Sequence, residues 1–195
     1  LRLADLPLLD LPMENAALAL QAYALLDLPW DSGCIASALQ ATKVTGRLDR
    51  RRLNWQGKSL TLLLDVGHNP HAAQFLAGRL QVSQPAGRRL AVFGLLADKD
   101  LPGVVAPLLA EVKHWAVTPL PTERSRSASE LHGHLLACAA QAEMHADVAS
   151  ALQAQCERAV EGDEILLFGS FFCVAEALMW LERHAQEGVQ DGNAG

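Results

Sequence analysis

The sequence predicts an α/β protein with a Rossmann-like, mostly parallel, doubly wound sheet of about six strands and helices on both faces, preceded by a short helical lead-in. Two observations carry this prediction. From residue 60 onward, short apolar runs alternate five times with amphipathic segments, and repeated strand–helix alternation implies parallel strands. Most of the runs are apolar throughout, as strands covered on both faces should be.

Two helices are expected before the sheet. The apolar residues of 14–28 fall largely on one helical face, and Pro29 ends that run. Asp31 stands where it can cap a second helix that reaches about Ala41. Residues 52–55, a Gln-Gly-Lys turn and residues 60–66 then predict a β-hairpin whose second strand enters the sheet.

The remaining elements follow in alternation. Strands are predicted over residues 60–66, 90–95, 114–118, 143–146 and 164–168, and helices over 70–80, 104–112, 128–140, 149–160 and 171–185. Residues 188–195, rich in Gly, Asn and Asp, predict a disordered tail. We therefore expect residues 1–45 to be the end of a preceding domain with its hinge, residues 46–187 to be the α/β domain, and residues 188–195 to be a tail.

Composition limits the class of protein. The 195 residues are 50% hydrophobic, enough for a packed core. A net charge of -6 and a single short basic cluster, residues 47–52, argue against nucleic acid and against a membrane surface as partners. No apolar run approaches the ~20 residues of a spanning helix, and the first residues lack the layout of a signal peptide. A soluble, cytoplasmic, monomeric protein is expected.

The cysteines show no functional spacing. Cys34, Cys138, Cys156 and Cys173 lie far apart within apolar stretches, with no pair or His-Cys cluster of metal-site spacing. We interpret all four as reduced core residues and expect no metal site in this chain. Because the chain begins with Leu1 rather than Met, we also interpret it as a fragment or a processed product.

Ligands of open α/β sheets bind beyond the carboxyl ends of the strands. The loop of residues 65–70 follows a buried strand, and in it Asn69 can cap the next helix with Pro70 at its first position. Asp65 and His68 would then lie beside a helix amino terminus, which favours anions. Asp65 could accept hydrogen bonds from ribose hydroxyls, and His68 could donate one to a phosphate or a ring nitrogen. Equally, Asp65 could only tie down the loop, with His68 an exposed turn residue.

Three other loops carry candidate residues. Lys99 lies between two aspartates, a pattern that is also typical of a solvated capping run. Arg124 precedes a helix for which Ser127 is the expected cap, and guanidinium groups bind carboxylates and phosphates but are also ordinary surface. Ser170 opens the last helix, where a Gly-Ser bend is also common turn chemistry. Arg47, at the junction with the lead-in, could grip a phosphate or form a surface turn.

Several common site motifs are missing. No GxxxxGK[ST] loop is present to wrap the phosphates of ATP, and no GxGxxG follows the first strand. No GxSxG nucleophile elbow occurs either.

Five segments together resemble the carboxy-terminal domain of the Mur-ligase superfamily and, within it, the bifunctional folylpolyglutamate/dihydrofolate synthases. Their order and spacing match along nearly the whole chain. The Asp-x-Gly/Ala-His-Asn-Pro string is the most specific of them. The segments are Asn-Ala-Ala-Leu-Ala-Leu at 15–20, Gly-Arg-Leu at 46–48, Leu-Asp-Val-Gly-His-Asn-Pro-His-Ala at 64–72, Ala-Asp-Lys-Asp at 97–100 and Leu-Phe-Gly-Ser-Phe-Phe at 167–172.

The resemblance implies an ATP-dependent ligase. Such enzymes activate a dihydropteroate or folate carboxylate as an acyl phosphate, which the amine of L-glutamate attacks, with Mg²⁺ neutralising the phosphate oxygens. The matching positions would place Asn15 on the adenine, Arg47 on the phosphates, Asp65 on the ribose and His68 near the adenosine or phosphates. His68 is also the one candidate catalytic residue.

The same resemblance implies a divided site. Ser170, Lys99 and Arg124 would line the facing cleft for glutamate or the intermediate, although residues 118–127 match the family only loosely. The phosphate-binding loop, the Mg²⁺ ligands and most of the pterin pocket belong to an amino-terminal domain that this chain lacks. ATP and Mg²⁺ would be held mainly there, that domain would be the partner across a hinge near Asn15, and this piece alone would be inactive.

Two other classes of protein share part of this pattern. A signalling receiver domain shares the five-fold repeat, but it needs an Asp after the third strand and a Lys after the fifth, where this chain has Thr118-Pro119 and Gly169-Ser170. A peptidoglycan Mur ligase shares the architecture, and such enzymes more often place other residues where His68-Asn69-Pro70 stands.

Overall fold

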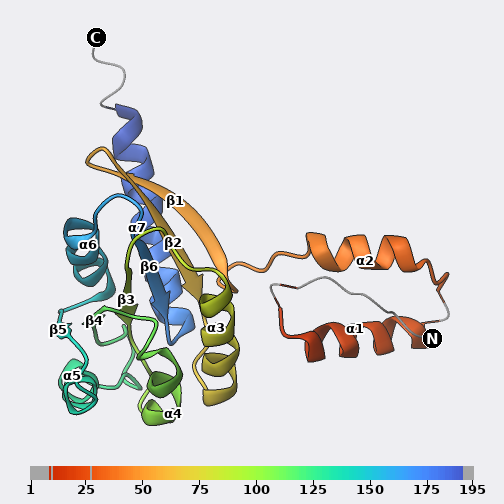
Figure 1. The fold of residues 1–195 in the computed structure, drawn as a ribbon, viewed down its shortest axis with the longest axis horizontal. Helices are drawn as coiled ribbons and strands as arrows, with labels where there is room; N and C mark the ends of the chain where they lie inside the picture. The colour runs from red at the N-terminus through yellow and green to blue at the C-terminus, as the bar shows by residue number, and fades with distance from the viewer. Residues whose placement is uncertain (1–8, 10, 27, 191–195) are drawn as a thin grey trace.

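The computed structural model describes residues 9, 11–26 and 28–190, with side chains described as far as residue 184. A six-stranded sheet forms the body of the molecule, in the order β1-β2-β6-β3-β4-β5 (Figure 1). All neighbouring strands are parallel except the hairpin pair β1 and β2. The predicted fold class is therefore confirmed. The strands are β1 Asp49–Trp55, β2 Lys58–Asp65, β3 Arg89–Phe93, β4 His114–Val117, β5 Ala142–Met144 and β6 Glu164–Phe168.

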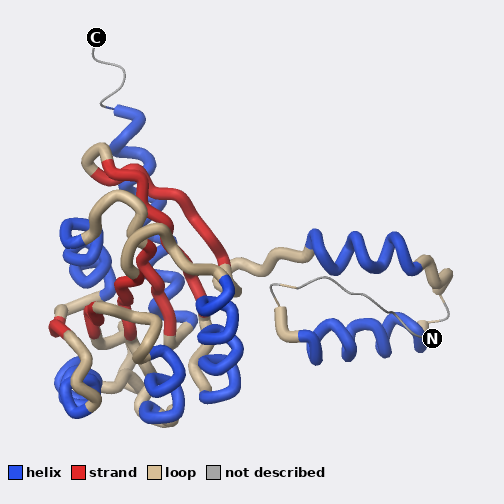
Figure 2. The backbone as a smooth tube through the Cα atoms, in the orientation of Figure 1, coloured by secondary structure: helices blue, strands red, loops and turns tan. Residues whose placement is uncertain are grey.

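Helices cover both faces of the sheet (Figure 2). Buried residues of α3, α4 and α5 share one hydrophobic cluster with one face of the strands, and buried residues of α6 and α7 share a second cluster with the other face. The helices are α1 Met13–Leu25, α2 Ser32–Ala41, α3 Pro70–Val82, α4 Leu101–Val105 with a 3₁₀ turn Ala106–Leu108, α5 Ala128–Ala137, α6 Val148–Arg158 and α7 Phe171–Gln190.

The central strand β6 shows why its sequence folds this way. Leu166 and Phe168 pack in the first cluster, whereas Ile165 and Leu167 pack in the second, because successive side chains of a strand point to opposite faces. All four are at most 1% exposed, and burying each stabilises the fold by about 1.5–3 kcal/mol. An apolar run without alternation is thus the signature of a strand with two covered faces.

Capping residues set several helix starts as predicted. The side chains of Asp31 and Asn69 accept hydrogen bonds from the backbone N–H groups of Cys34 and Ala72, both at 2.9 Å. Ser127 forms a capping box with Glu130 at the start of α5. Each cap satisfies N–H groups that have no partner inside the helix.

Several predicted boundaries differ from the structure by a few residues, and two helices are the most informative cases. The helix predicted over 104–112 begins at Leu101, because Asp100 caps it and Pro102 suits its first turn, and it tightens into a 3₁₀ turn that contains Pro107, which has no backbone N–H to donate. The last helix continues to Gln190, so residues 188–190 of the predicted tail are helical. Residues 191–195 lie outside the described residues.

Two of the four cysteines do not lie in the core as predicted. Cys156 and Cys173 are buried, but Cys34 and Cys138 are exposed, and all four are free thiols. Both exposed cysteines lie in or beside helices that turn much of their surface to solvent, so an apolar sequence neighbourhood was a poor guide to burial there.

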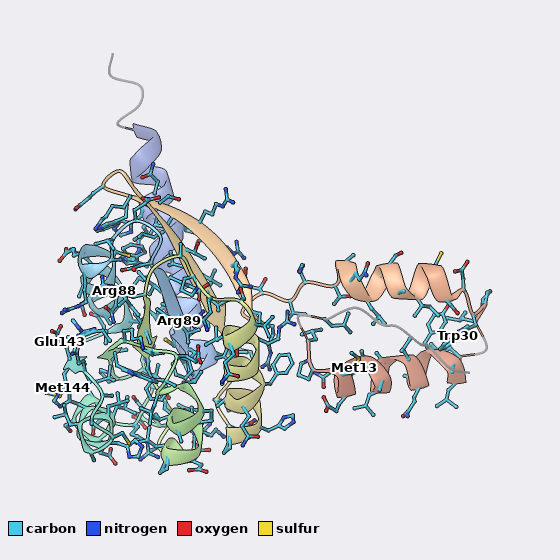
Figure 3. The ribbon with its side chains drawn as sticks, in the orientation of Figure 1. Met13, Trp30, Arg88, Arg89, Glu143 and Met144 are labelled. Carbon is cyan, nitrogen blue, oxygen red and sulfur yellow. The ribbon has the colours of Figure 1, made fainter. Side chains whose placement is uncertain are left out.

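The two lead-in helices project away from the sheet as an antiparallel pair (Figure 1). Only Ala16 is buried in α1, and no residue of α2 is buried. The far end of the pair, near Trp30 in Figure 3, is held by a hydrogen bond of 2.9 Å from the Tyr23 hydroxyl to the Pro29 carbonyl. This pair therefore has no core of its own.

Candidate functional site

Asp65 ends β2 at the carboxyl edge of the sheet and holds two loops together. Its Oδ2 accepts a hydrogen bond of 3.0 Å from the Leu48 N–H, and its Oδ1 accepts one of 2.7 Å from the Gly67 N–H. The Val66 N–H donates to the Gly46 carbonyl at 2.8 Å, which fixes the same loop from the other side. Asp65 thus ties the turn at residues 46–48 to the end of the strand.

The electrostatics of Asp65 follow from its burial. The residue is 5% exposed, and desolvation raises the pKa of its carboxyl group, against the opposing effect of the two backbone hydrogen bonds and of the nearby Arg47 charge. The guanidinium of Arg47 is half-buried and makes no hydrogen bond to the residues described. A positive charge without a hydrogen-bonded partner among the described residues therefore lies beside the buried carboxyl group.

A pocket of about 180 Å³ brings together three of the predicted nucleotide-binding residues. Asn15 from α1, Arg47 from the turn and Asp65 from β2 all line it, at the amino terminus of α3. The dipole of that helix favours negative charge at this end. The other lining residues are Pro12, Glu14, Asn69, His71, Ala72 and Phe75.

Sequence reasoning missed Glu14, His71 and Phe75 as lining residues. His71 and Phe75 are one helical turn apart on α3, so both reach the same side of the pocket. The signal for them was this i, i+4 spacing after the Asn69 cap. No comparable signal pointed to Glu14, because α1 reaches the pocket only through the tertiary structure.

His68 lies beside this pocket and contacts the last helix. Its Nδ1 lies 2.8 Å from the Val66 carbonyl oxygen, and its ring centroid is 6.2 Å from that of Phe171. A carbonyl oxygen only accepts, so Nδ1 carries the hydrogen, and Nε2 of the neutral ring is then an acceptor. Only the protonated ring could donate from Nε2 to a phosphate.

Ser170 is buried at the start of α7, with 2% of its surface exposed. Its hydroxyl oxygen accepts a hydrogen bond of 2.9 Å from the Phe172 N–H, so it satisfies a donor in the first turn of the helix. Gly169 before it has φ +102°, and a Cβ there would lie 2.5 Å from the Gly94 carbonyl oxygen. Only glycine allows β3 and β6 to end so close together.

Lys99 and Arg124 lie in a second group, on two loops joined to each other. The Arg124 Nη2 lies 3.3 Å from Asp98, and the Lys99 ammonium lies 2.9 Å from the same aspartate. Arg126 donates to the carbonyl groups of Ala97 and Lys99 at 2.6 and 2.9 Å. Arg124 is 68% exposed, so these pairs contribute little to stability.

Neither group contains a metal centre among the residues that the structure describes, since no three His, Cys, Asp or Glu side chains converge there. Within the same residues, no helix is long and apolar enough to cross a membrane. The pocket at α3 offers an amide, a guanidinium, a carboxylate and a helix amino terminus. Those groups suit the base, phosphates and ribose of a nucleotide.

Comparison with known proteins shows the family of this chain. Residues 46–171 match the family described as Mur ligase, glutamate ligase domain. The chain is 33% identical over 186 residues to the dihydrofolate synthase/folylpolyglutamate synthase of Escherichia coli, covering 95% of this chain and 42% of that protein. The corresponding enzyme of Haemophilus influenzae is 31% identical over 90% of this chain and 44% of its own length.

Solved structures give the same result. E. coli FolC in complex with DHPP and ADP superposes with a TM-score of 0.81 at 33% identity, covering 94% of this chain and 42% of that one. A bifunctional folylpolyglutamate synthase/dihydrofolate synthase with Mn, AMPPNP and L-glutamate bound superposes with a TM-score of 0.80 at 35% identity, covering 92% and 42%. This chain thus spans less than half the length of these relatives. It belongs to the Mur ligase family and contains that family's glutamate ligase domain.

Proposed function

We propose that this chain is the carboxy-terminal part of an ATP-dependent ligase that adds L-glutamate to dihydropteroate and to (tetrahydro)folate through an acyl phosphate. The observation that carries the proposal is the pocket where Asn15, Arg47 and Asp65 meet at the carboxyl edge of a Mur ligase domain. The relatives with ADP and DHPP, and with AMPPNP, Mn and L-glutamate, support the choice of ligands.

Each pocket residue has a chemical task in this proposal. The Asn15 amide can donate to and accept from the edge of adenine, and Arg47 offers a charged fork to phosphate oxygens. Asp65 accepts one backbone N–H on each oxygen, and because each carboxylate oxygen has a second lone pair, a ribose hydroxyl can still donate to it. These three residues would thus bind the nucleotide from the side opposite its reacting phosphate.

The chemistry needs more than this chain supplies. Formation of an acyl phosphate requires donors and cations around the transferring phosphoryl group, and this sequence has no GxxxxGK[ST] loop. ATP and Mg²⁺ would therefore be held mainly by an amino-terminal domain, and the isolated chain would be inactive. Ser170, Lys99 and Arg124 would face the cleft between the domains. Of these, Lys99 and Arg124 would supply the positive charge that binds a carboxylate of the substrate.

The lead-in helices are the natural contact with that domain. Large apolar side chains on and beside α1 and α2 are exposed, among them Met13, Leu18, Leu25 and Leu28, and an apolar pocket of about 310 Å³ lies between the two helices. Because two helices cannot bury such faces by themselves, we assign residues 1–45 to the end of the preceding domain and its hinge. The whole protein would be a cytoplasmic monomer without nucleic-acid or membrane partners.

The test restores the missing part of the chain and follows ADP release with dihydropteroate and L-glutamate. Release should need both substrates and should fall at least about a hundredfold, roughly 3 kcal/mol of barrier, in Asp65→Ala and in His68→Ala. Lys113→Ala, an exposed position at the amino end of β4, serves as the matched control and should leave the rate unchanged.

Two results would contradict the proposal. Turnover only with a peptidoglycan precursor would replace the substrate class with that of the cell-wall ligases. Full activity of both site variants would leave the family assignment intact but remove the site.

A further inference from the structure

The turn that carries Arg47 is held by a carboxylate on each side. Asp65 accepts a hydrogen bond of 3.0 Å from the N–H of Leu48, the residue after Arg47. Asp49, at the start of β1, accepts one of 3.3 Å from the N–H of Gly46, the residue before it. Asp65 lines the pocket proposed for the nucleotide, whereas the proposed function does not use Asp49.

The backbone of this turn has an unusual conformation. Gly46 and Leu48, on either side of Arg47, have φ values of +73° and +45°, in the left-handed region. A leucine is unfavourable there and keeps such a conformation only where its surroundings fix it, which happens most often at functional sites. Leu48 is 5% exposed and its N–H is bound by Asp65. The structure therefore maintains a strained turn whose central residue is Arg47.

Arg51 in turn fixes the carboxylate of Asp49. Its Nε and Nη2 donate to the two oxygens of Asp49 at 2.8 and 2.9 Å, and such a bidentate pair sets the orientation of the carboxylate. These bonds hold the pKa of Asp49 below its usual range. The Arg51 side chain is 46% exposed and that of Asp49 is 14% exposed. Because a pair with so exposed a member contributes little to stability, its geometry calls for a role other than folding.

The side chain of Arg47 depends on its backbone for its position. Arg47 lines both the pocket proposed for the nucleotide and a second pocket of about 390 Å³, which Asp49 and Arg51 also line. Its guanidinium makes no hydrogen bond to the residues that the structure describes. The turn therefore sets where this side chain begins, and a group that is already in place loses less freedom when a ligand binds.

We propose that Asp49 and Arg51 are positioning residues: Arg51 orients the carboxylate of Asp49, which holds the Gly46 N–H and so directs Arg47 toward the phosphates of the nucleotide. The proposal rests on the ligase function above and deepens it, because Arg47 is the residue assigned there to the phosphates. Asp49 and Arg51 act through Arg47 and not on the ligand. Their effects on nucleotide binding should therefore disappear when Arg47 is removed.

The first experiment measures backbone order in this chain without any ligand, by nitrogen-15 relaxation. In the wild type, the amide of Arg47 should have an order parameter of about 0.85, as in rigid backbone. Asp49→Ala removes the acceptor of the Gly46 N–H, and the value for Arg47 should fall below about 0.6. Arg51→Gln leaves the carboxylate in place but loosens it, so the fall should be smaller.

Arg52→Gln is the matched control, because Arg52 is the next residue of β1, is exposed and lines neither pocket. It should leave the order parameter of Arg47 unchanged, and circular dichroism should show that all variants are folded. An Arg47 amide that stays as rigid in Asp49→Ala as in the wild type would overturn the proposal.

The second experiment uses the full-length ligase and compares its two substrates. Asp49→Ala should raise the KM for ATP about two- to twelvefold, the contribution of one hydrogen bond, and leave the KM for L-glutamate unchanged. Asp49→Asn, which keeps the shape of the side chain and loses its charge, should change the KM for ATP in the same direction by a smaller factor. Arg52→Gln should change neither constant.

Double variants separate positioning from direct binding and from folding. Asp49→Ala should not raise the KM for ATP further in an Arg47→Ala enzyme, and Arg51→Gln should not raise it further in an Asp49→Ala enzyme. Effects that persist in these backgrounds would mean that Asp49 or Arg51 binds the nucleotide itself or only supports the fold, and the proposal would be wrong. If the wild-type enzyme does not turn over glutamate, the proposed function fails, while the order parameters of this chain still decide whether Asp49 holds the Arg47 turn.

Discussion

The two edges of the sheet carry similar residue types and use them differently. At the amino edge, Arg89 at the start of β3 and Glu164 at the start of β6 are paired at 2.7 Å, with side chains 1% and 5% exposed. At the carboxyl edge, among the described residues, the buried Asp65 accepts only from backbone N–H groups, and the side chain of Arg47 makes no hydrogen bond. The buried charges at the amino edge are paired with each other, whereas Asp65 and the Arg47 side chain at the carboxyl edge form no hydrogen bond with each other.

The difference indicates where a ligand belongs. The buried Arg89–Glu164 pair is completed by Glu111, Arg50 and the Ser83 carbonyl, so this network has no capacity left for a ligand and the amino edge is structural. At the carboxyl edge, the cation beside a helix amino terminus can still bind an anion. The carboxylate, held in place by backbone N–H groups, can still accept another hydrogen bond. The carboxylates of the two edges are similarly buried but have opposite roles, one structural and one in ligand binding. Their hydrogen-bond partners distinguish these roles.

The largest effect is expected from breaking the amino edge. Arg89→Leu removes the buried partner of Glu164, which keeps only its 3.7 Å ion pair with the exposed Arg50, and it also removes bonds to Glu111 and to the Ser83 carbonyl. We expect the free energy of unfolding to fall by about 3–5 kcal/mol, measured by urea titration. Arg89→Met combined with Glu164→Leu should recover much of the loss, because an apolar pair needs no charge partner. A loss under about 1 kcal/mol in the single variant would show that this edge is not held by charge.

At the carboxyl edge, Asp65→Asn should cost less. Asparagine keeps one acceptor oxygen but turns an amide NH₂ toward either the Leu48 or the Gly67 N–H, so one donor loses its partner. We expect a loss of about 1–3 kcal/mol by the same titration. Asn15→Ala, an exposed position lining the same pocket, is the control and should stay within about 0.5 kcal/mol of the wild type. Equal losses in both would mean that the pocket, and not the carboxylate, holds the turn.

The sequence predicted the fold because its signals are local. Apolar runs and capping residues depend on neighbours within a few positions, and the caps at Asp31, Asn69 and Ser127 were all read correctly from the sequence. The helix α4 starts three residues earlier than predicted, because its start is set by the Asp100 cap and Pro102 and not by the apolar pattern.

The site was predictable only in part. The loop at residues 65–70 follows a strand in an α/β sheet, and that rule pointed to Asp65 and His68. That Asn15 lies in the same pocket depends on how α1 folds back, and that His68 carries its hydrogen on Nδ1 depends on the Val66 carbonyl. Both facts arise from tertiary contacts that no local pattern contains.

A pH titration sharpens the structural side of the comparison. His114 is buried at the amino edge, its Nδ1 accepts from the Gln155 amide at 3.2 Å, and Glu143 and Arg158 lie beyond it. Burial, reinforced by the Arg158 charge, lowers the pKa of His114 below its usual 6.5. The unfolded chain therefore binds this proton first, so the histidine's contribution is complete above about pH 6.5 and is lost as the pH falls toward the folded pKa. Between about pH 7 and pH 5, His114→Gln should show a shallower loss of stability than the wild type, and an identical slope would mean that His114 titrates alike in both states.

The smallest effect on stability should come from Arg47→Ala, and that is the sharpest test of the comparison. Arg47 is half-buried, and its charge lowers the pKa of Asp65, opposing the burial that raises it. Removing a half-buried side chain that has no hydrogen-bond partner among the described residues should change the free energy of unfolding by no more than about 0.5 kcal/mol. In the full-length ligase the same change should raise the KM for ATP at least about tenfold, since charged bonds to a phosphate contribute about 1.5–3 kcal/mol. We therefore expect Arg47, at the carboxyl edge, to contribute to ligand binding and not to the stability of the fold. A variant that unfolded as readily as Arg89→Leu would show that both edges are held by charge, and the distinction between them would be lost.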